Sequence, residues 1–177
     1  MRIISGKYKN KKLIGFDIEG TRPTMDRVKE SVFGMIQNYL KNSIVLDLFA
    51  GSGSLGIEAL SNGSRVCYFV DNNIKLINII KENTKNINEE VHIIKNDYIE
   101  SLNYFKNNDI KFDVIFLDPP YKLNLISKAI ELIEKYDLLN SNGIIICEYE
   151  MEIFDSKYKI IKEKKYGSKN IKIYINN

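Results

Sequence analysis

The segment FDVIFLDPPY, residues 112–121, ends an apolar run with a carboxylate, two prolines and an aromatic ring. Two of the chain's three prolines, Pro119 and Pro120, stand here. Consecutive prolines fix φ and remove two N–H donors, so the loop is extended and presents acceptors. Asp118 and the Pro119 carbonyl are then two fixed acceptors for the exocyclic amine of a nucleobase, and Tyr121 offers a ring for stacking. Accepting from both N–H groups frees the lone pair of the nitrogen, so the segment predicts a site that prepares a base amine for attack.

A second motif with chemical potential is the loop DLFAGSGSLG, residues 47–56. Its glycines, at the G-x-G-x-x-G positions, are Gly51, Gly53 and Gly56. Such glycines permit a tight turn and aim the N–H groups of a following helix at an acceptor. Asp71, twenty residues after the first glycine, suits the hydroxyls of a ribose. Both a nicotinamide dinucleotide and S-adenosylmethionine fit this loop, and a plain tight turn explains it poorly once Asp47 and Asp71 are included.

Alternating apolar and helical segments position these two motifs. Five apolar runs predict strands, at 44–49, 65–71, 91–97, 112–118 and 143–150. Helical spacing or length predicts helices between them and before the first, with apolar positions at Val28, Val32, Met35, Ile36 and Leu40 in the leading helix. Nearly continuous apolar strands separated by helices predict an α/β fold with a parallel sheet covered on both faces. Two lysine-rich alternating runs near residues 157–176 predict an antiparallel hairpin at its edge.

In a doubly wound sheet, ligands bind beyond the carboxyl ends of the strands. This rule selects the loop after Phe49, Asp71, Asn96 with Asp97, and residues 118–121. Asp97 is a candidate acceptor for an adenine amino group, and a role as a helix cap explains it equally well. Residues 118–121 favour S-adenosylmethionine over a nicotinamide, because hydride transfer has no use for paired acceptors and a stacking ring.

The charge distribution suits a polyanionic partner. Residues 1–29 carry eight Lys/Arg against three Asp/Glu, and residues 157–177 carry seven against one. The intervening part carries eleven against nineteen, within a net charge of +3. Two basic ends around an acidic body favour binding of a nucleic acid. Lysines that merely solvate termini and edge strands explain the same pattern.

Other classes of protein are disfavoured. The two cysteines, Cys67 and Cys147, lie in separate apolar segments, and His92 is the only histidine, so no metal site is expected. Reduced thiols predict a cytoplasmic protein. No apolar run reaches the length of a membrane span, and the first residues lack the apolar centre of a signal peptide.

Together these motifs resemble those of amino-directed, S-adenosylmethionine-dependent methyltransferases. The starting segment RIISGKYKNKKL, followed by TRPTMDRVKESVF, narrows the resemblance to the RsmD family, which methylates N2 of a guanine in small-subunit ribosomal RNA. It spans essentially the whole chain, including KYGS near the C-terminus. One departure is Asn10, where the family usually has glycine in the turn of a hairpin. Asparagine also tolerates that conformation.

The resemblance implies a Rossmann-like class I methyltransferase fold: a mostly parallel seven-stranded sheet with helices on both faces and an N-terminal β-hairpin extension. Residues 1–20 would form a basic RNA-binding hairpin, and residues 21–177 the methyltransferase domain. The implied activity is of the 16S rRNA (guanine(966)-N(2))-methyltransferase type. The implied partner is small-subunit ribosomal RNA or the assembling 30S particle. The implied protein is a monomer with no membrane or obligate protein partner.

The resemblance also assigns roles to residues. It assigns catalysis to Asp118, Pro119, Pro120 and Tyr121. It assigns binding of S-adenosylmethionine, without a metal, to Asp47, Phe49, Ala50, Gly51, Ser52, Gly53, Asp71, Asn72, Asn96, Asp97, Tyr98 and Asp118. RNA contacts would come from Arg2, Lys7, Lys9, Lys11, Lys12, Arg22 and Arg27. In the implied in-line displacement, Asp118 is first of all an orienting acceptor, because the proton can be lost late and no strong base is needed.

Three other hypotheses stay open at this level. An amino-methyltransferase of adenine N6 or cytosine N4, in DNA or another RNA, would use the same chemistry at Asp118. A nicotinamide oxidoreductase fits the glycine loop but not Asp47 or residues 118–121. A non-catalytic RNA-binding protein with a vestigial cofactor fold predicts damaged motifs, whereas every strand-end position here is filled.

Overall fold

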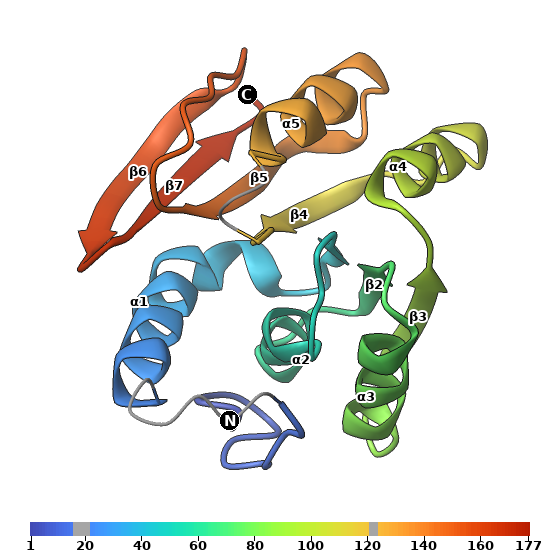
Figure 1. The fold of residues 1–177 in the computed structure, drawn as a ribbon, viewed down its shortest axis with the longest axis vertical. Coiled ribbons are helices and arrows are strands. Elements are labelled where there is room, and N and C mark those ends of the chain that lie inside the picture. Colours follow the sequence, from blue (N-terminus) through green and yellow to red (C-terminus); the bar gives the residue numbers. More distant parts are fainter. Residues whose placement is uncertain (16–21, 121–123) are drawn as a thin grey trace.

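The computed structural model describes residues 1–15, 22–120 and 124–177, without the side chains of residues 22–25. Its central sheet is flanked by helices on both faces (Figure 1). The helices are α1 (Arg22–Leu40), α2 (Ser54–Ser61), α3 (Ile74–Thr84), α4 (Tyr98–Asn107) and α5 (Ile126–Lys135). The strands are β1 (Ile44–Asp47), β2 (Val66–Asp71), β3 (Glu90–Lys95), β4 (Phe112–Leu117), β5 (Leu139–Tyr149), β6 (Lys159–Tyr166) and β7 (Lys169–Ile175). None of the helices in the described ranges has the length and apolar character needed to cross a membrane.

The sheet confirms the predicted fold class. Its seven strands in the described chain follow the order β3-β2-β1-β4-β5-β7-β6. The first five in chain order pair in parallel, and β7 pairs antiparallel with both β5 and β6. The lysine-rich runs therefore form the predicted edge hairpin. Because β1 and β4 are neighbours although β2 and β3 lie between them in sequence, the chain reverses direction across the sheet beside β1, where ligands bind in such folds.

Two hydrophobic cores sandwich the sheet. Alternation along the strands sends Val45 to one core and Leu46 to the other. The first core packs the sheet against α1, α2 and α3, and the second packs it against α4 and α5, as Figure 1 shows. The N-terminal segment, residues 1–15, joins the first core through Ile3 and Leu13, both buried. This segment therefore packs as part of the domain's main core.

The N-terminal segment reverses direction as expected, but with less regular pairing than two strands. Antiparallel bridging is confined to Arg2 and Lys12. Asn10 takes the left-handed conformation with φ of 69°, which confirms that asparagine serves in this turn. Other backbone groups of the segment bond to α2 instead: the Lys7 N–H donates to the carbonyl of Ser61 at 2.8 Å. The segment is thus bonded across its own turn, for example from the Ile3 N–H to the Lys11 carbonyl at 3.0 Å, and is also fastened to α2.

A buried ion pair completes this attachment. Glu58 of α2 is fully buried and lies 3.1 Å from the ammonium of Lys29 in α1. Its carboxylate also accepts from the backbone N–H groups of Ile4, at 2.9 Å, and Ser5, at 2.8 Å. The Lys29 ammonium donates in turn to the carbonyl of Arg2 at 2.7 Å. The two charges are therefore satisfied by each other and by the N-terminal backbone, as buried charges must be.

We expect the Glu58→Gln substitution to destabilise the protein by about 3–5 kcal/mol, because it leaves Lys29 buried without its countercharge. It should also expose the N-terminal segment to proteolysis, since an amide presents donors to the backbone N–H groups that Glu58 now accepts from. Urea unfolding and mass-spectrometric mapping of early protease cuts measure both effects. Glu131→Gln, which removes the exposed partner of Lys128, is the matched control and should change stability by less than about 1 kcal/mol. An unfolding midpoint of Glu58→Gln equal to that of the wild type would refute the role of the pair.

Candidate functional site

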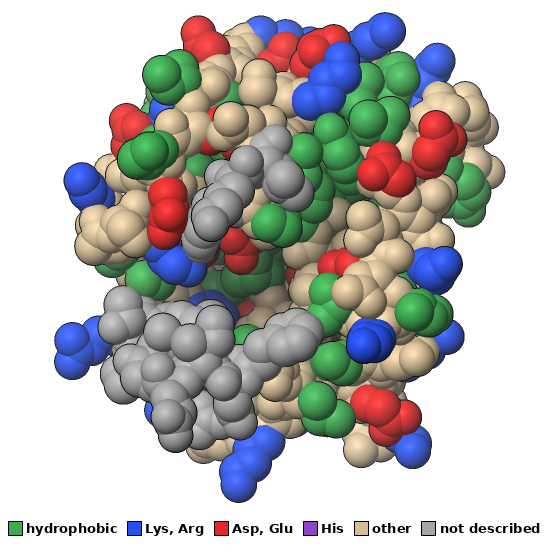
Figure 2. All heavy atoms as spheres, viewed as in Figure 1, with side chains coloured by type: hydrophobic (Ala, Val, Ile, Leu, Met, Phe, Trp, Pro, Cys, Tyr) green, Lys and Arg blue, Asp and Glu red, His purple; other side chains and the backbone are tan. Residues whose placement is uncertain are grey.

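A cavity of about 1000 Å³ opens beyond the carboxyl ends of the parallel strands. Figure 2 shows the surface hollowed near its middle, with acidic and hydrophobic side chains inside the hollow. Its walls come from the loops after β1, β2, β3 and β4, from the end of β5, and from α1 and Met1. The predicted positions that line it are Asp47, Phe49, Ala50, Gly51, Ser52, Asp71, Asn72, Asn96, Asp97, Tyr98, Asp118, Pro119 and Pro120. Gly53 supports the loop without lining the cavity, and Tyr121 lies outside the described residues.

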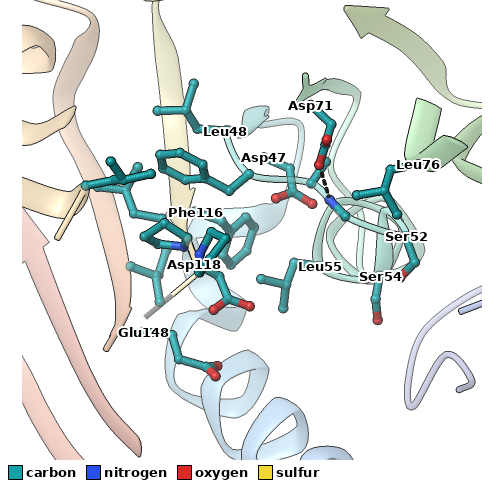
Figure 3. A pocket seen from close by; sticks show the side chains of 18 of the residues that line it. Asp47, Leu48, Ser52, Ser54, Leu55, Asp71, Leu76, Phe116, Asp118 and Glu148 are labelled. Carbon is teal, nitrogen blue, oxygen red and sulfur yellow. Dashed lines mark hydrogen bonds between the residues drawn. The ribbon is translucent and has the colours of Figure 1, made fainter. Parts of the chain in front are cut away.

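Two carboxylates hold the glycine loop in shape. The Gly56 N–H donates to Asp47 at 3.0 Å. The Gly51 N–H donates to Asp71 at 3.0 Å, the bond that is dashed in Figure 3. Gly53 needs its lack of a side chain because its φ is 79°. A Cβ on Gly56 would lie 2.3 Å from the ring of Phe69, so only glycine lets α2 approach β2 this closely. The loop is therefore fixed before any ligand binds.

The Asp47 carboxylate is buried at the base of the loop. Burial raises its pKa to about 7, a rise that the nearby Asp71 reinforces and the Gly56 N–H opposes. Asp47 thus anchors the loop internally and lines the cavity only at its floor. Near neutral pH its carboxyl group is poised between the two protonation states.

The residues that follow β2 and β3 line another part of the cavity wall. The second oxygen of Asp71 accepts from the Asn73 N–H at 2.9 Å. Asp97 caps α4 by accepting from the Ile99 N–H at 2.8 Å, so the capping interpretation of this residue is confirmed. The rings of Phe49 and Tyr98 lie 5.3 Å apart and are tilted by 44°. The two rings therefore pack against each other and give this side of the cavity an aromatic surface next to polar groups.

Asp118 lies at the other side of the cavity, after β4. Its carboxylate and that of Glu148 lie close together, across the cavity from Asp47 and Asp71 (Figure 3). Burial raises the pKa of Asp118 well above its usual range, and the negative charge of Glu148 adds to this rise while Lys169 opposes it. Pro119, which follows, is buried, whereas Pro120 is exposed. The predicted acceptor is thus held in a rigid wall of the cavity.

Several lining residues were not predicted from the sequence. Glu148 ends the apolar part of β5, and its carboxylate forms an ion pair with Lys169 at the start of β7. Both side chains line the cavity, as does Lys29 of the buried pair. The rule that ligands bind beyond the carboxyl ends of strands would have found Glu148 if it had been applied to the fifth strand. Lys29 carries no such signal in the sequence.

The predicted RNA-binding side chains that the structure describes do not line the cavity. Arg2 pairs with Asp26 at 3.3 Å, and Lys7 pairs with Glu89 at 2.7 Å. The remaining described ones are largely exposed at Lys9, Lys12 and Arg27 and partly exposed at Lys11. The side chain of Arg22 is not among those described. Within the described chain, no group of three or more His, Cys, Asp or Glu side chains is arranged to hold a metal ion.

The sheet order and the position of the cavity define the class I methyltransferase fold. A solved structure of HI0767 from Haemophilus influenzae superimposes with a TM-score of 0.81 at 33% identity, covering 99% of this chain and 97% of that one. The fold is also that of the tRNA m1G37 methyltransferase of M. jannaschii, with a TM-score of 0.64 at 19% identity. That match covers 88% of this chain and 50% of the other.

The family of the chain follows from its sequence relatives. The family model described as Conserved hypothetical protein 95 matches residues 1–175. YlbH of Bacillus subtilis is 40% identical over 180 residues, with 98% of each chain covered. Ribosomal RNA small subunit methyltransferase D of Haemophilus influenzae is 36% identical over 182 residues, covering 99% of this chain and 94% of the relative. The chain belongs to this family, the RsmD family, and the resemblance noted in its motifs is confirmed.

We expect Asp47 to make stability depend on pH. Its raised pKa means that the folded protein keeps a proton that the unfolded chain loses. Asp47 therefore adds to the free energy of unfolding fully below about pH 4, and this addition is lost as pH rises through about 7. The Asp47→Asn variant, which does not titrate there, should lose less stability than the wild type between these pH values. Urea unfolding across this range measures the free energy of unfolding of both proteins. Asp118, whose pKa is also raised, changes stability with pH in the same direction, but it is present in both proteins and cancels in the comparison. Parallel pH profiles for the two proteins would contradict the assignment.

Proposed function

We propose that this protein transfers a methyl group from S-adenosylmethionine to the exocyclic N2 of a guanine in small-subunit ribosomal RNA. The observation that carries the proposal is that Asp118 and Pro119 line the same cavity as the glycine loop and Asp71. A methyl donor on one side and an amine on the other would meet in its middle. Membership of the RsmD family supports the same reaction.

The residues present fit the proposed cofactor. Bound S-adenosylmethionine would supply a methyl group already activated by a sulfonium. The loop at Gly51 would receive its methionine end, Asp71 its ribose hydroxyls, and the surface formed by Phe49 and Tyr98 beside Asp97 its adenine. Both oxygens of Asp71 accept backbone N–H groups, but a carboxylate has about four acceptor sites, so ribose hydroxyls can still be bound.

The acceptor amine would be held by fixed oxygens. The Asp118 carboxylate and the carbonyl of Pro119 would accept its two N–H groups and aim its lone pair at the methyl carbon. The N–C bond forms as the C–S bond breaks, and the amine then releases one proton. The raised pKa of Asp118 suits it to receive that proton. Alignment of this kind supplies about 7–11 kcal/mol of the barrier reduction in well-oriented reactions.

The basic ends of the chain would hold the RNA outside the cavity. We assign phosphate contacts to the segment of residues 1–20, with the methyltransferase domain following from residue 21. A guanine must leave its stack to reach Asp118, as bases do in other enzymes that modify them. We further propose that the protein acts in the cytoplasm, as a monomer, on ribosomal RNA or on the assembling 30S particle.

We expect the Asp118→Asn variant to lose about 100-fold or more in methyl transfer while its affinity for S-adenosylmethionine stays within about threefold of wild type. The assay follows labelled methyl transfer to small-subunit particles, naked ribosomal RNA and duplex DNA, with the product digested to nucleosides. N2-methylguanosine from ribosomal substrates alone is the expected product. Asp109→Asn, in the turn before β4 at the far end of the sheet, is the matched control and should keep full activity.

The identity of the nucleoside separates the alternatives. Methyladenosine or methylcytidine would retain the chemistry at Asp118 and refute the guanine acceptor. Tight cofactor binding without transfer to any of the substrates would refute the proposed reaction. Full activity of the Asp118→Asn variant would refute the role of this carboxylate.

For the RNA contacts, we expect simultaneous Lys→Gln substitutions at Lys9, Lys11 and Lys12 to weaken binding and to reduce the slope of log K against log[salt] by about 2. Each phosphate contact releases condensed counterions from the RNA on binding, so the slope is proportional to the number of contacts and falls when contacts are lost. Fluorescence anisotropy with ribosomal RNA between 50 and 200 mM salt (about the range in which such slopes are read) measures it. The control makes the same charge change at three other lysines: Lys106 in the last turn of α4, Lys111 just before β4, and Lys135 at the end of α5. An equal loss of slope in the control would show a general charge effect and contradict the assignment.

A further inference from the structure

Strand register places two carboxylates side by side at the substrate side of the cavity, and an ion pair adds an ammonium to this row. Leu117 of β4 is paired with Cys147 of β5, so Asp118 and Glu148 are the next pair of neighbours. Both point to the face that carries α1, because Phe116 and Ile146, two residues earlier, lie in the core under that helix.

Lys169 continues the row on the neighbouring strand. Glu148 is paired with Ile171 of β7, and Lys169, two residues away, shares the face of Ile171. The ion pair between Lys169 and Glu148 fits this placement. Across adjacent strands the cavity therefore offers carboxylate, carboxylate and ammonium in that order.

This order matches the Watson–Crick edge of one base. Guanine presents, in sequence, the N2 amine as a donor, N1–H as a donor and O6 as an acceptor. We propose that Glu148 is the residue that selects guanine: its carboxylate accepts from N1–H while Asp118 accepts from N2, and Lys169 donates to O6. The inference rests on the proposed function and names the base-selecting residue of that same site.

The row rejects the other amino-bearing bases. Adenine and cytosine can each offer an exocyclic amine to Asp118, but the ring nitrogen beside that amine is an acceptor in both. That acceptor would face the Glu148 carboxylate, and two acceptors repel each other. A buried site built for an N–H donor discriminates strongly against a base that presents an acceptor there, because the hydrogen bond from N1–H is lost and repulsion takes its place.

The surroundings of the row strengthen this selection. The carboxylate side chain of Glu148 is 14% exposed, and that of Lys169 is 28% exposed. Apolar side chains of Val28, Val32 and Ile171 line the cavity beside them. Hydrogen bonds to charged groups in such low-dielectric surroundings are stronger than in water, and mismatches cost more. Lys169 has three N–H donors, so its ion pair with Glu148 is compatible with a bond to O6.

The test replaces single atoms of the substrate. In small-subunit RNA, the accepting guanosine, located from the wild-type product, is exchanged for 2-aminopurine, which keeps the N2 amine but has an acceptor at N1 and no O6. The full-length wild type should methylate guanosine with a kcat/KM at least about 100-fold above that for 2-aminopurine. Equal rates on the two bases would overturn the inference and leave the proposed function intact.

The matched variants are Glu148→Gln and Glu150→Gln, two residues apart at the end of β5. A glutamine at 148 can donate to an acceptor at N1, so activity on guanosine should fall about 10- to 100-fold and the preference over 2-aminopurine should shrink to less than about tenfold. Glu150 accepts from Ser168 and does not line the cavity, so its variant should keep both values. Unchanged affinity for S-adenosylmethionine separates base selection from a structural role. An undiminished preference in Glu148→Gln would overturn the inference, and a wild type that methylates no guanosine would overturn the proposed function with it.

Discussion

The ion pair and hydrogen bonds of the buried Glu58 carboxylate hold together the parts of the chain that close one side of the cavity. The carboxylate joins three parts that are distant in sequence: α1 through Lys29, α2 through its own backbone, and the N-terminal segment through two N–H groups. A carboxylate in this position cannot return to water without unfolding its surroundings, so the three parts form together or not at all. The consequence reaches the cavity, because Met1 lines it and the Lys29 ammonium donates to Ser54 at the start of α2.

A second link runs from the N-terminal segment to the glycine loop. The side-chain amide of Asn83 in α3 donates to the carbonyls of Ile14 and Ser52, at 2.8 and 2.9 Å, while its oxygen accepts from the Ile14 N–H. The segment proposed to meet RNA is therefore bonded to the loop proposed to meet the cofactor. For the proposed reaction this gives RNA contact and cofactor binding a common support.

The sequence predicted what depends on periodicity and missed what depends on tertiary pairing. Apolar runs and helical spacing were sufficient for the parallel sheet, the edge hairpin and the strand-end residues that line the cavity, because these follow from local pattern and one topological rule. The pair of Glu58 and Lys29 could not be foreseen, since nothing local marks two helical residues whose partners include backbone groups far along the chain. Glu148 was within reach of the strand-end rule, but its meaning required the register that sets it beside Asp118.

Acidic and basic side chains occupy different parts of the molecule, and this separation bears on which groups can enter the cavity in the proposed reaction. Carboxylates of Asp47, Asp71, Asp118 and Glu148 line the cavity, whereas the lysines of the N-terminal segment lie outside it. Phosphates are attracted by the lysines and repelled by those acidic groups of the cavity that are ionised, so the donor edge of an extruded base is the part of an RNA that fits inside. The same carboxylates favour a ligand that carries a sulfonium over the uncharged thioether that remains after transfer. Methyl transfer would therefore remove the positive charge that helps to hold the cofactor. The affinity of the acidic cavity for the cofactor product would fall as soon as that product forms.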